Sequence, residues 1–237
     1  MRNSDEKGRV AVITGATKGL GKALSFAFAT AGYEVIGVYR SDSDNAKIVE
    51  SEFKAKKLRG HFIRQDITED GNWEEFDQIV EANRDKHFTL IANASSPFVP
   101  KPFHLYEWTD FSNQLEVNVR GTFLIFRRLL PTIIKNQGTF ITVLSSVLNL
   151  PPKGFAAYLV AKSALEGLTK AAAAEYSDRG LRVFSVSPGF MKTPLTDAWS
   201  DHLKSMIDSK GDIIQTPQKV AEEVLELAEG CKTKEEP

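Results

Sequence analysis

Short apolar segments rich in β-branched residues alternate with longer segments of helical period along most of this chain. This alternation predicts βαβ units, in which helices connect parallel strands and cover both faces of one sheet. Strands are expected at residues 9–14, 33–39, 60–65, 88–92, 139–144 and 181–186. Helices are expected at residues 20–31, 45–58, 73–83, 111–134, 157–177, 195–208 and 217–228. The first helix should end before Gly32, and the last should begin after Thr216, whose side chain suits an N-cap.

The chain shows no internal repeat, no linker rich in glycine, serine or proline, and no shift in composition that would mark a second domain. We therefore expect a single α/β domain over residues 1–237. Residues 1–7 and 232–237 are expected to be flexible, because charged residues replace hydrophobic ones there.

Charge and hydropathy exclude several classes of protein. The 30 basic and 31 acidic residues nearly cancel, which disfavours electrostatic binding of nucleic acid. The most apolar stretch, residues 122–134, contains two arginines and a proline and is too short to span a bilayer. A polar start without a signal-peptide pattern, together with the single Cys231, favours a reducing, cytoplasmic compartment.

A glycine-rich turn follows the first expected strand, where residues 14–21 read TGATKGLG. Glycines let the backbone approach a pyrophosphate, and the N–H groups and positive dipole at a helix start attract that anion. A mononucleotide P-loop is excluded, because Ala16 replaces its first glycine and Ala23 replaces its metal-binding hydroxyl. The spacing G-x-x-x-G-x-G is close to a dinucleotide fingerprint, although a merely tight strand-to-helix turn would produce it too.

Further motifs follow this turn in a fixed order: Asn93-Ala94-Ser95, Asn118 within Val-Asn-Val-Arg-Gly, Ser145, Tyr158-x-x-x-Lys162 and Pro188-Gly189-x-x-x-Thr193. Together they resemble the short-chain dehydrogenase/reductase family, in the compact single-domain form of the 3-oxoacyl reductases. The resemblance covers roughly residues 9–193. It implies a Rossmann-type, doubly wound parallel sheet of six strands in the order 3-2-1-4-5-6, with helices on both faces.

Tyr158 and Lys162 lie four residues apart on an expected helix, so their side chains share one face. A neighbouring ammonium favours the phenolate and lowers the pKa of a tyrosine toward the working range. The resemblance implies that Tyr158 donates a proton to a carbonyl under reduction. It also implies that Lys162 tunes this tyrosine and holds the nicotinamide ribose.

Two serines, Ser145 and Ser146, compete for the role of holding the substrate oxygen. The register that is usual in the family, counted from Gly138 and from Tyr158, selects Ser145. For Asn118, the resemblance implies a kinked helix and a water on a proton relay through Lys162. The alternative is a buried asparagine that only satisfies a neighbouring carbonyl.

The end of the second strand bears on the choice between NAD and NADP. NAD-preferring relatives usually have an acid in the place of Tyr39, whereas here Lys18 and Arg40 supply positive charge for a 2′-phosphate. NADP is therefore the predicted cofactor, although Asp42 and Asp44 lie close enough to compensate. The predicted cofactor-binding residues are Gly15, Thr17, Lys18, Gly19, Leu20, Gly21, Arg40, Ser41, Asp66, Ile67, Asn93, Ala94, Tyr158, Lys162, Pro188, Gly189 and Thr193.

Within that set, Asp66 and Ile67 resemble the family's adenine-binding pair, and Asp66 as an N-cap is the alternative. No metal site is expected, because the four histidines are scattered without ligand spacing.

Two features depart from the family. Ser95 stands where a glycine is usual, and the chain is not expected to form the seventh strand of many relatives. We expect a homodimer through the helices that hold Asn118 and Tyr158, and do not carry over tetramer formation.

The predicted activity is NADPH-dependent reduction of a ketone or another carbonyl compound to a secondary alcohol. One alternative is NAD-dependent oxidation of a secondary alcohol by the same residues, and another is an NADP-binding module without catalysis. The presence of all four catalytic candidates argues against an idle site. Apolar residues in the segments 95–105, 147–155 and 195–206 predict a partly hydrophobic small-molecule substrate. They include Phe98, Phe103, Leu148, Leu150, Phe155, Trp199 and Met206.

Overall fold

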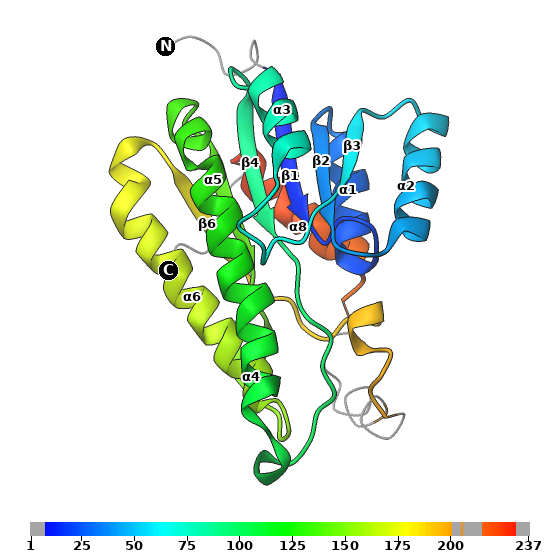
Figure 1. The fold of residues 1–237 in the computed structure, drawn as a ribbon, viewed down its shortest axis with the longest axis vertical. Helices are drawn as coiled ribbons and strands as arrows, with labels where there is room; N and C mark the ends of the chain where they lie inside the picture. Colours follow the sequence, from blue (N-terminus) through cyan, green and yellow to red (C-terminus); the bar gives the residue numbers. More distant parts are fainter. Residues whose placement is uncertain (1–7, 201–204, 206–214, 231–237) are drawn as a thin grey trace.

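The computed structural model describes residues 8–200, 205 and 215–230, which form a six-stranded sheet flanked by helices (Figure 1). The strands are β1 (Arg9–Thr14), β2 (Glu34–Tyr39), β3 (Gly60–Arg64), β4 (His87–Ala92), β5 (Thr139–Val143) and β6 (Arg182–Val186). They lie in the order β3-β2-β1-β4-β5-β6, and every neighbouring pair is parallel. The predicted fold class and strand order are confirmed.

The helices alternate with the strands as expected. They are α1 (Gly19–Thr30), α2 (Ser43–Ala55), α3 (Glu74–Ala82), α4 (Trp108–Leu115), α5 (Thr122–Lys135), α6 (Ala156–Tyr176) and α8 (Pro217–Glu229). A π-helical segment, Glu116–Gly121, joins α4 to α5, so the single helix expected at residues 111–134 is irregular in its middle. At residues 195–208 the described part shows a short 3₁₀ turn, Pro194–Thr196, and Ser205 in helical conformation, and residues 201–204 and 206–208 lie outside it.

Side chains alternate between two hydrophobic cores, one on each face of the sheet. Ala11 and Ile13 of β1 face a core shared with α1, α2 and α8. Val10 and Val12 face the other core, which α3, α5 and α6 cover. In Figure 1, α3 lies in front of the strands and α8 behind them. Because both faces are covered, strands of nearly continuous apolar residues are stable here.

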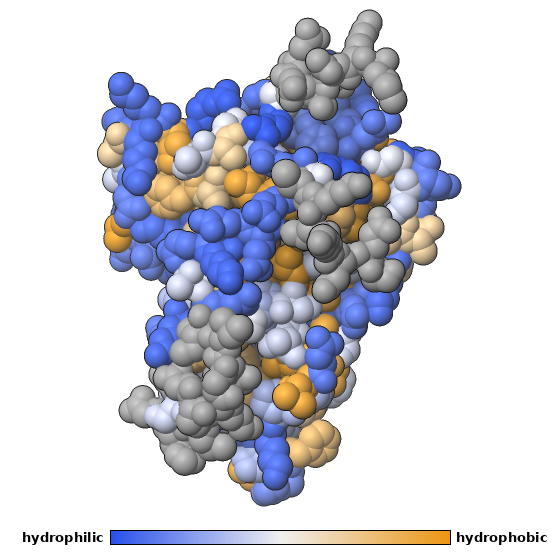
Figure 2. All heavy atoms as spheres, turned by 180° about the vertical axis from the view of Figure 1, so that it is seen from behind, coloured by the Kyte–Doolittle hydropathy of each residue, from blue (hydrophilic) through white to orange (hydrophobic). Residues whose placement is uncertain are grey.

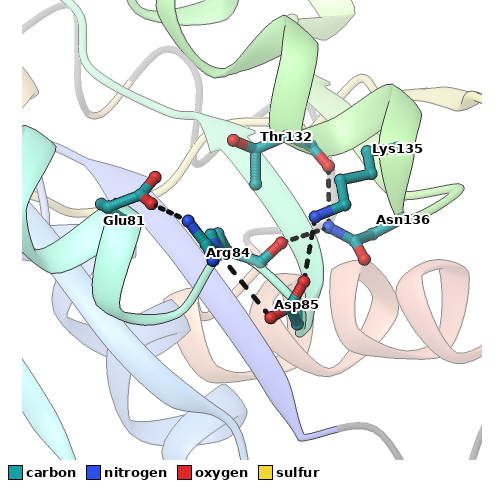
Figure 3. A network of polar contacts seen from close by, with 6 residues as sticks. All are labelled: Glu81, Arg84, Asp85, Thr132, Lys135 and Asn136. Carbon is teal, nitrogen blue, oxygen red and sulfur yellow. Dashed lines mark hydrogen bonds and ion pairs between the residues drawn. The ribbon is translucent and has the colours of Figure 1, made fainter.

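A polar network holds the end of the sheet at which β4 begins (Figure 3). The Asn136 side chain donates to the carbonyl oxygens of Arg84, at 2.8 Å, and Thr132, at 3.0 Å. Lys135 Nζ lies 2.9 Å from Asp85 Oδ1. These contacts fasten the end of α5 to the turn before β4. They lie opposite the carboxyl ends of the strands, where ligands bind in open parallel sheets.

Three expectations concern residues outside the described part of the chain. These are the flexibility of residues 1–7 and 232–237, and the lack of a seventh strand after α8. Each stays a prediction. Among the helices that the structure describes, none combines the length and apolarity needed to cross a membrane.

Candidate active site

A cavity of about 510 Å³ lies along the carboxyl ends of the strands. It is lined by the glycine-rich turn after β1 and by segments that follow β2 to β6. Every predicted site residue except Asn118 contributes to its lining: Gly15, Thr17, Lys18, Gly19, Leu20, Gly21, Arg40, Ser41, Asp66, Ile67, Asn93, Ala94, Ser145, Tyr158, Lys162, Pro188, Gly189 and Thr193. Parallel strand order thus brings motifs from most of the chain to one place.

The glycines of the turn are required by its geometry. Gly15 has a φ of +67° and donates its N–H to the Val38 carbonyl at 2.8 Å. A Cβ on Gly21 would lie 1.9 Å from the Gly15 carbonyl oxygen, so only glycine fits there. The helix α1 starts next, and its N-cap, Lys18, makes no side-chain capping bond. The first N–H groups of a helix have no partner within the helix, so this uncapped start suits an anion.

Asn93 and Thr14 fasten the end of β4 to this turn. Thr14 Oγ1 accepts hydrogen bonds from the N–H groups of Asn93, at 3.0 Å, and Ala94, at 2.9 Å. The Asn93 side chain donates to the Thr14 carbonyl at 2.9 Å. The side chain of Asn93 therefore shapes the floor of the cavity. The motif contained Thr14, but sequence reasoning assigned no role to its hydroxyl.

Ser95, which stands where the family usually has a glycine, also lines the cavity. Its hydroxyl oxygen is buried and has no hydrogen-bond partner among the described residues.

Tyr158, Lys162 and Ser145 meet at one end of the cavity. Tyr158 and Lys162 lie in the first turns of α6, and both are buried. Lys162 Nζ lies 5.6 Å from the centre of the Tyr158 ring. Ser145 follows β5, and its side chain forms a hydrogen bond with Tyr158. The neighbouring Ser146 is exposed and lines the same cavity. Ser145, which the family's usual register selects, is the serine that contacts the tyrosine.

The protonation of this pair differs from the expectation that Lys162 lowers the pKa of Tyr158. Burial raises the pKa of Tyr158 to about 12, and the hydrogen bond from Ser145 offsets this only in part. Burial also lowers the pKa of Lys162 to about 7. Desolvation dominates because both groups lie in the protein interior. Tyr158 therefore keeps its proton at neutral pH, as a proton donor must.

Asn118 lies in the π-helical segment and is fully buried. Its Nδ2 donates to the Gln114 carbonyl at 2.9 Å, as expected for an asparagine that satisfies a neighbouring carbonyl. Its Oδ1 is buried without a partner among the described residues. Gln114 was missed by sequence reasoning. Its buried Nε2 donates to the carbonyl oxygens of Ser96, at 3.0 Å, and Pro97, at 3.3 Å. The only signal was its position one helical turn before Asn118.

At the far end of the cavity, Lys18 and Arg40 stand near Asp42. Lys18 Nζ lies 3.4 Å from Asp42 Oδ2. Hydrogen bonds from Asn45, with the nearby Lys18, hold the pKa of Asp42 below its usual range. The predicted compensation by Asp42 therefore exists for Lys18. Arg40 is exposed, and no described acidic side chain pairs with it.

Asp66 forms a local turn rather than a helix cap. Its Oδ1 accepts hydrogen bonds from the Thr68 N–H, at 2.9 Å, and the Thr68 hydroxyl, at 2.8 Å. The next helix, α3, begins only at Glu74. Asp66 is half-buried and lines the cavity together with Ile67.

The loop after β6 closes the cavity from the side of α8. The Gly189 N–H donates to Gln215 Oε1 at 2.9 Å, and the Gln215 N–H donates to the Phe190 carbonyl at 3.2 Å. Thr193 packs against the glycine turn, because a Cβ on Gly19 would lie 3.3 Å from Thr193 Cβ. Gln215 stands directly before α8, and nothing in its sequence context indicated this role.

An aromatic cluster, made of Phe98, Phe155, Phe190 and Trp199, lies beside Tyr158. The Phe98 ring stacks on the Tyr158 ring, with centres 4.6 Å apart and an interplanar angle of 12°. Three of these residues come from the segments predicted to contact substrate, and Phe190 comes from the loop after β6. Met206, also expected there, lies outside the described residues. No cluster of metal-ligating side chains is found in the described part of the chain.

Known proteins are related to this chain in sequence. Residues 9–204 match the family described as short chain dehydrogenase. The 3-oxoacyl-(acyl-carrier-protein) reductase of Staphylococcus epidermidis is 30% identical over 200 residues, which cover 83% of this chain and 81% of that protein. The 2,5-dichloro-2,5-cyclohexadiene-1,4-diol dehydrogenase of Sphingobium indicum is 33% identical over 191 residues, covering 80% and 75%.

Two solved structures have a fold similar to that of this chain. A 3-ketoacyl-(acyl-carrier-protein) reductase from Brucella melitensis, complexed with NADH, has a TM-score of 0.83 at 26% identity and covers 94% of this chain and 91% of its own. A protein from Beutenbergia cavernae with bound NADP has a TM-score of 0.81 at 25% identity, covering 94% and 90%. The chain belongs to the short chain dehydrogenase family of oxidoreductases.

Proposed function

We propose that this protein reduces a ketone or another carbonyl compound to a secondary alcohol with NADPH, and that a single domain binds the cofactor and carries the catalysis. The observation that carries the proposal is the convergence of Ser145, Tyr158 and Lys162 in the cavity that also contains the glycine turn. When bound, the reduced nicotinamide supplies the hydride.

The residues of the cavity fit a dinucleotide. The uncapped start of α1 presents N–H groups to the pyrophosphate, and Gly21 leaves no side chain in the way. Lys162 would hold the nicotinamide ribose, while Thr193 and Gly189 would hold the nicotinamide. Asp66 and Ile67 would contact the adenine, and Arg40 and Ser41 would contact the adenosine ribose and its phosphate.

Tyr158 acts as the proton donor. As the carbonyl carbon gains a hydride, its oxygen becomes an alkoxide, which takes the Tyr158 proton, and Ser145 stabilises the developing negative charge. A pKa of about 12 suits this direction, because the phenol stays protonated until a strongly basic oxygen forms next to it. Lys162 and Asn118 would return a proton from solvent to the tyrosine.

NADPH is preferred in this proposal because Arg40 is free to pair with a 2′-phosphate, and because Tyr39 stands where an acid would repel one. The main alternative is NAD-dependent oxidation of a secondary alcohol. NADH in the Brucella structure and NADP in the Beutenbergia structure indicate that similar folds accept either cofactor. Reduction uses Tyr158 in its protonated form, the form that the raised pKa maintains, whereas oxidation requires the tyrosine as a base.

The deciding experiment measures NADPH oxidation with a panel of carbonyl compounds by wild type, Tyr158→Phe and a control, Tyr176→Phe, which lies at the other end of α6. Loss of the general acid should lower kcat about 10²- to 10⁴-fold, with the Kd for NADPH within a few-fold of wild type. The control should retain full activity. NADPH binding without turnover by wild type would support the non-catalytic module instead.

We also propose a homodimer through α5 and α6. Phe123 and Val160 support it, because these apolar side chains are 42% and 43% exposed on the two helices. Light scattering on wild type and on Val160→Glu tests it, and a monomeric wild type would contradict it.

A further inference from the structure

The aromatic cluster packs beside Tyr158 and lines the cavity together with it. The ring centres of Phe98 lie 5.3 Å from those of Phe155 and Trp199, and Phe155 lies 5.1 Å from Trp199. These three contacts are edge-to-face, the arrangement that aromatic rings prefer. A substrate whose carbonyl reaches Tyr158 must therefore place its neighbouring group against aromatic rings.

Apart from Lys162 beside Tyr158, this part of the cavity has no charged lining residue in the described chain. Its lining comes from the segments 95–98, 145–155 and 190–199, and none of the described lining residues in these segments is charged. The charged lining residues, Lys18, Arg40, Asp42, Asp66 and Lys162, belong to the glycine turn, the ends of β2 and β3, and α6. A substrate carboxylate or phosphate beside the aromatic cluster would lose its hydration without gaining an opposite charge.

Phe98 is held in place from two sides. The Trp199 indole Nε1 donates to the Phe98 carbonyl at 3.0 Å. The Gln114 side chain donates to the carbonyl oxygens of Ser96 and Pro97, immediately before it. Fixed rings lose little conformational freedom on binding, so they discriminate between ligand shapes better than mobile side chains do.

Exposed apolar side chains adjoin this region. Leu150 lines the cavity and is 81% exposed, and Val99 beside Phe98 is exposed too. Figure 2 shows hydrophobic residues, in orange, among hydrophilic ones at the lower end of the molecule, where α4 begins in Figure 1. Such side chains favour approach of an uncharged, apolar compound.

We propose that Phe98 determines substrate specificity, and that the site takes an uncharged carbonyl compound whose carbonyl is attached to a flat apolar ring. The inference rests on the proposed carbonyl reduction at Tyr158. The ring lies against the cavity side of Phe98, Phe155 and Trp199 while the carbonyl oxygen reaches Ser145 and Tyr158. Charged sugar or acid substrates are disfavoured, because the described segments 95–98, 145–155 and 190–199 contribute no charged residue to the lining.

The test compares kcat/KM for matched ketones with NADPH. 4-Methylacetophenone and 4-acetylbenzoate share ring and carbonyl and differ in charge, and the neutral ketone should be favoured about 100-fold or more. Cyclohexyl methyl ketone replaces the flat ring by a puckered one and should be reduced about 10-fold less efficiently than acetophenone. Phe98→Leu should bring the ratio of these last two ketones close to one. Phe103 was expected to contact substrate but does not line the cavity, so Phe103→Leu, a change at a 76% exposed ring, should leave the ratio unchanged.

Binding of 4-methylacetophenone to the complex with NADP⁺, measured by calorimetry, separates the two proposals. Binding weakened by Phe98→Leu, without turnover of any carbonyl compound, supports this class of ligand at the site and overturns the reductase proposal. Two results overturn the substrate class alone. One is turnover that favours 4-acetylbenzoate or the puckered ketone. The other is a Phe98→Leu variant with the same ratio of kcat/KM for acetophenone and cyclohexyl methyl ketone as wild type. If neither binding nor turnover is observed, both proposals are overturned.

Discussion

Lys162 Nζ lies 2.7 Å from the carbonyl oxygen of Val143, the last residue of β5. This hydrogen bond joins the helix that carries Tyr158 to the strand that leads to Ser145. An amine donates such a bond whether it is charged or neutral, so the contact survives deprotonation. Burial, which lowers the pKa of Lys162 to about 7, therefore sets its charge without releasing it from the strand.

The lowered pKa of Lys162 predicts how stability depends on pH. Between pH 7 and about 10.5 the lysine of the unfolded chain is protonated and that of the folded chain is mostly neutral. Because the unfolded state then binds more protons, the free energy of unfolding should rise with pH across this window, by at most about 1.4 kcal/mol per pH unit. Below pH 7 both states are protonated, and this contribution is lost.

Urea unfolding of wild type and Lys162→Met between pH 6 and about 9.5 measures this slope, and the difference between them isolates Lys162 from other groups. The variant should be relatively most stable at low pH, where wild type buries a charge, and the gap should shrink as pH rises. Lys170→Met, which removes an exposed lysine of the same helix, is the control and should follow wild type. Parallel curves for wild type and Lys162→Met would contradict the shift.

The fold was predictable because its signals are local. Apolar β-branched runs such as residues 9–14 and 139–143 can be buried on both faces only as central strands. The glycine spacing of residues 15–21 and the four-residue spacing of Tyr158 and Lys162 also depend only on neighbouring positions. The π-helical segment around Asn118 was expected only as a kink, because no pattern of residue types specifies a π-helix.

The parts of the site that escaped prediction depend on contacts between distant segments. Gln114 and Gln215 hold loops through main-chain atoms, which no side-chain motif reveals. The predicted direction of the Tyr158 pKa shift was wrong for a similar reason. The sequence displays its charged neighbour, four residues away, whereas the Phe98 ring that helps to bury it lies sixty residues earlier.

Arg40 and Asp42 should shift the choice of cofactor in opposite directions. Arg40→Ala removes the exposed guanidinium and should lower the ratio of kcat/KM for NADPH over NADH about 10-fold, as expected for loss of a charge-assisted hydrogen bond. Asp42→Asn removes the partner of Lys18 and should raise that ratio several-fold. Arg59→Ala, which lies just before β3 and donates to the Gly32 carbonyl before β2, should leave the ratio unchanged. An unchanged ratio in Arg40→Ala would remove the support for NADP.

Gln114 should act as a positioning residue for the loop that carries Phe98. Gln114→Met keeps the size but cannot donate to the Ser96 and Pro97 carbonyls. With Phe98 less firmly stacked, Tyr158 becomes less buried, and its pKa should fall from about 12 toward 10. Reduction requires the protonated phenol, so the variant should lose kcat at a lower pH than wild type.

The measurement is kcat as a function of pH from 6 to about 10.5. Over this range, deprotonation of Tyr158 should not lower the kcat of wild type. A purely structural defect would lower kcat equally at every pH and would leave the shape of the profile unchanged. Gln78→Met, an exposed glutamine of α3, is the control. Identical pH profiles for wild type and Gln114→Met would exclude the positioning role.

Gly21 and Gly167 offer a matched pair of glycine-to-alanine changes in helices. A methyl group at Gly21 would lie 1.9 Å from the Gly15 carbonyl oxygen and 2.8 Å from Asn93 Nδ2, so the turn must move. Gly21→Ala should lower the free energy of unfolding by about 1–3 kcal/mol, as overpacking does, and weaken NADPH binding at least about 10-fold. At Gly167 of α6 a methyl group meets nothing within 4 Å. Gly167→Ala should raise stability by about 0.5–1 kcal/mol, because alanine is the better helix former, and leave NADPH binding unchanged. Thermal unfolding with and without NADPH measures both effects, and equal behaviour of the two variants would mean that the turn is not the cofactor cradle.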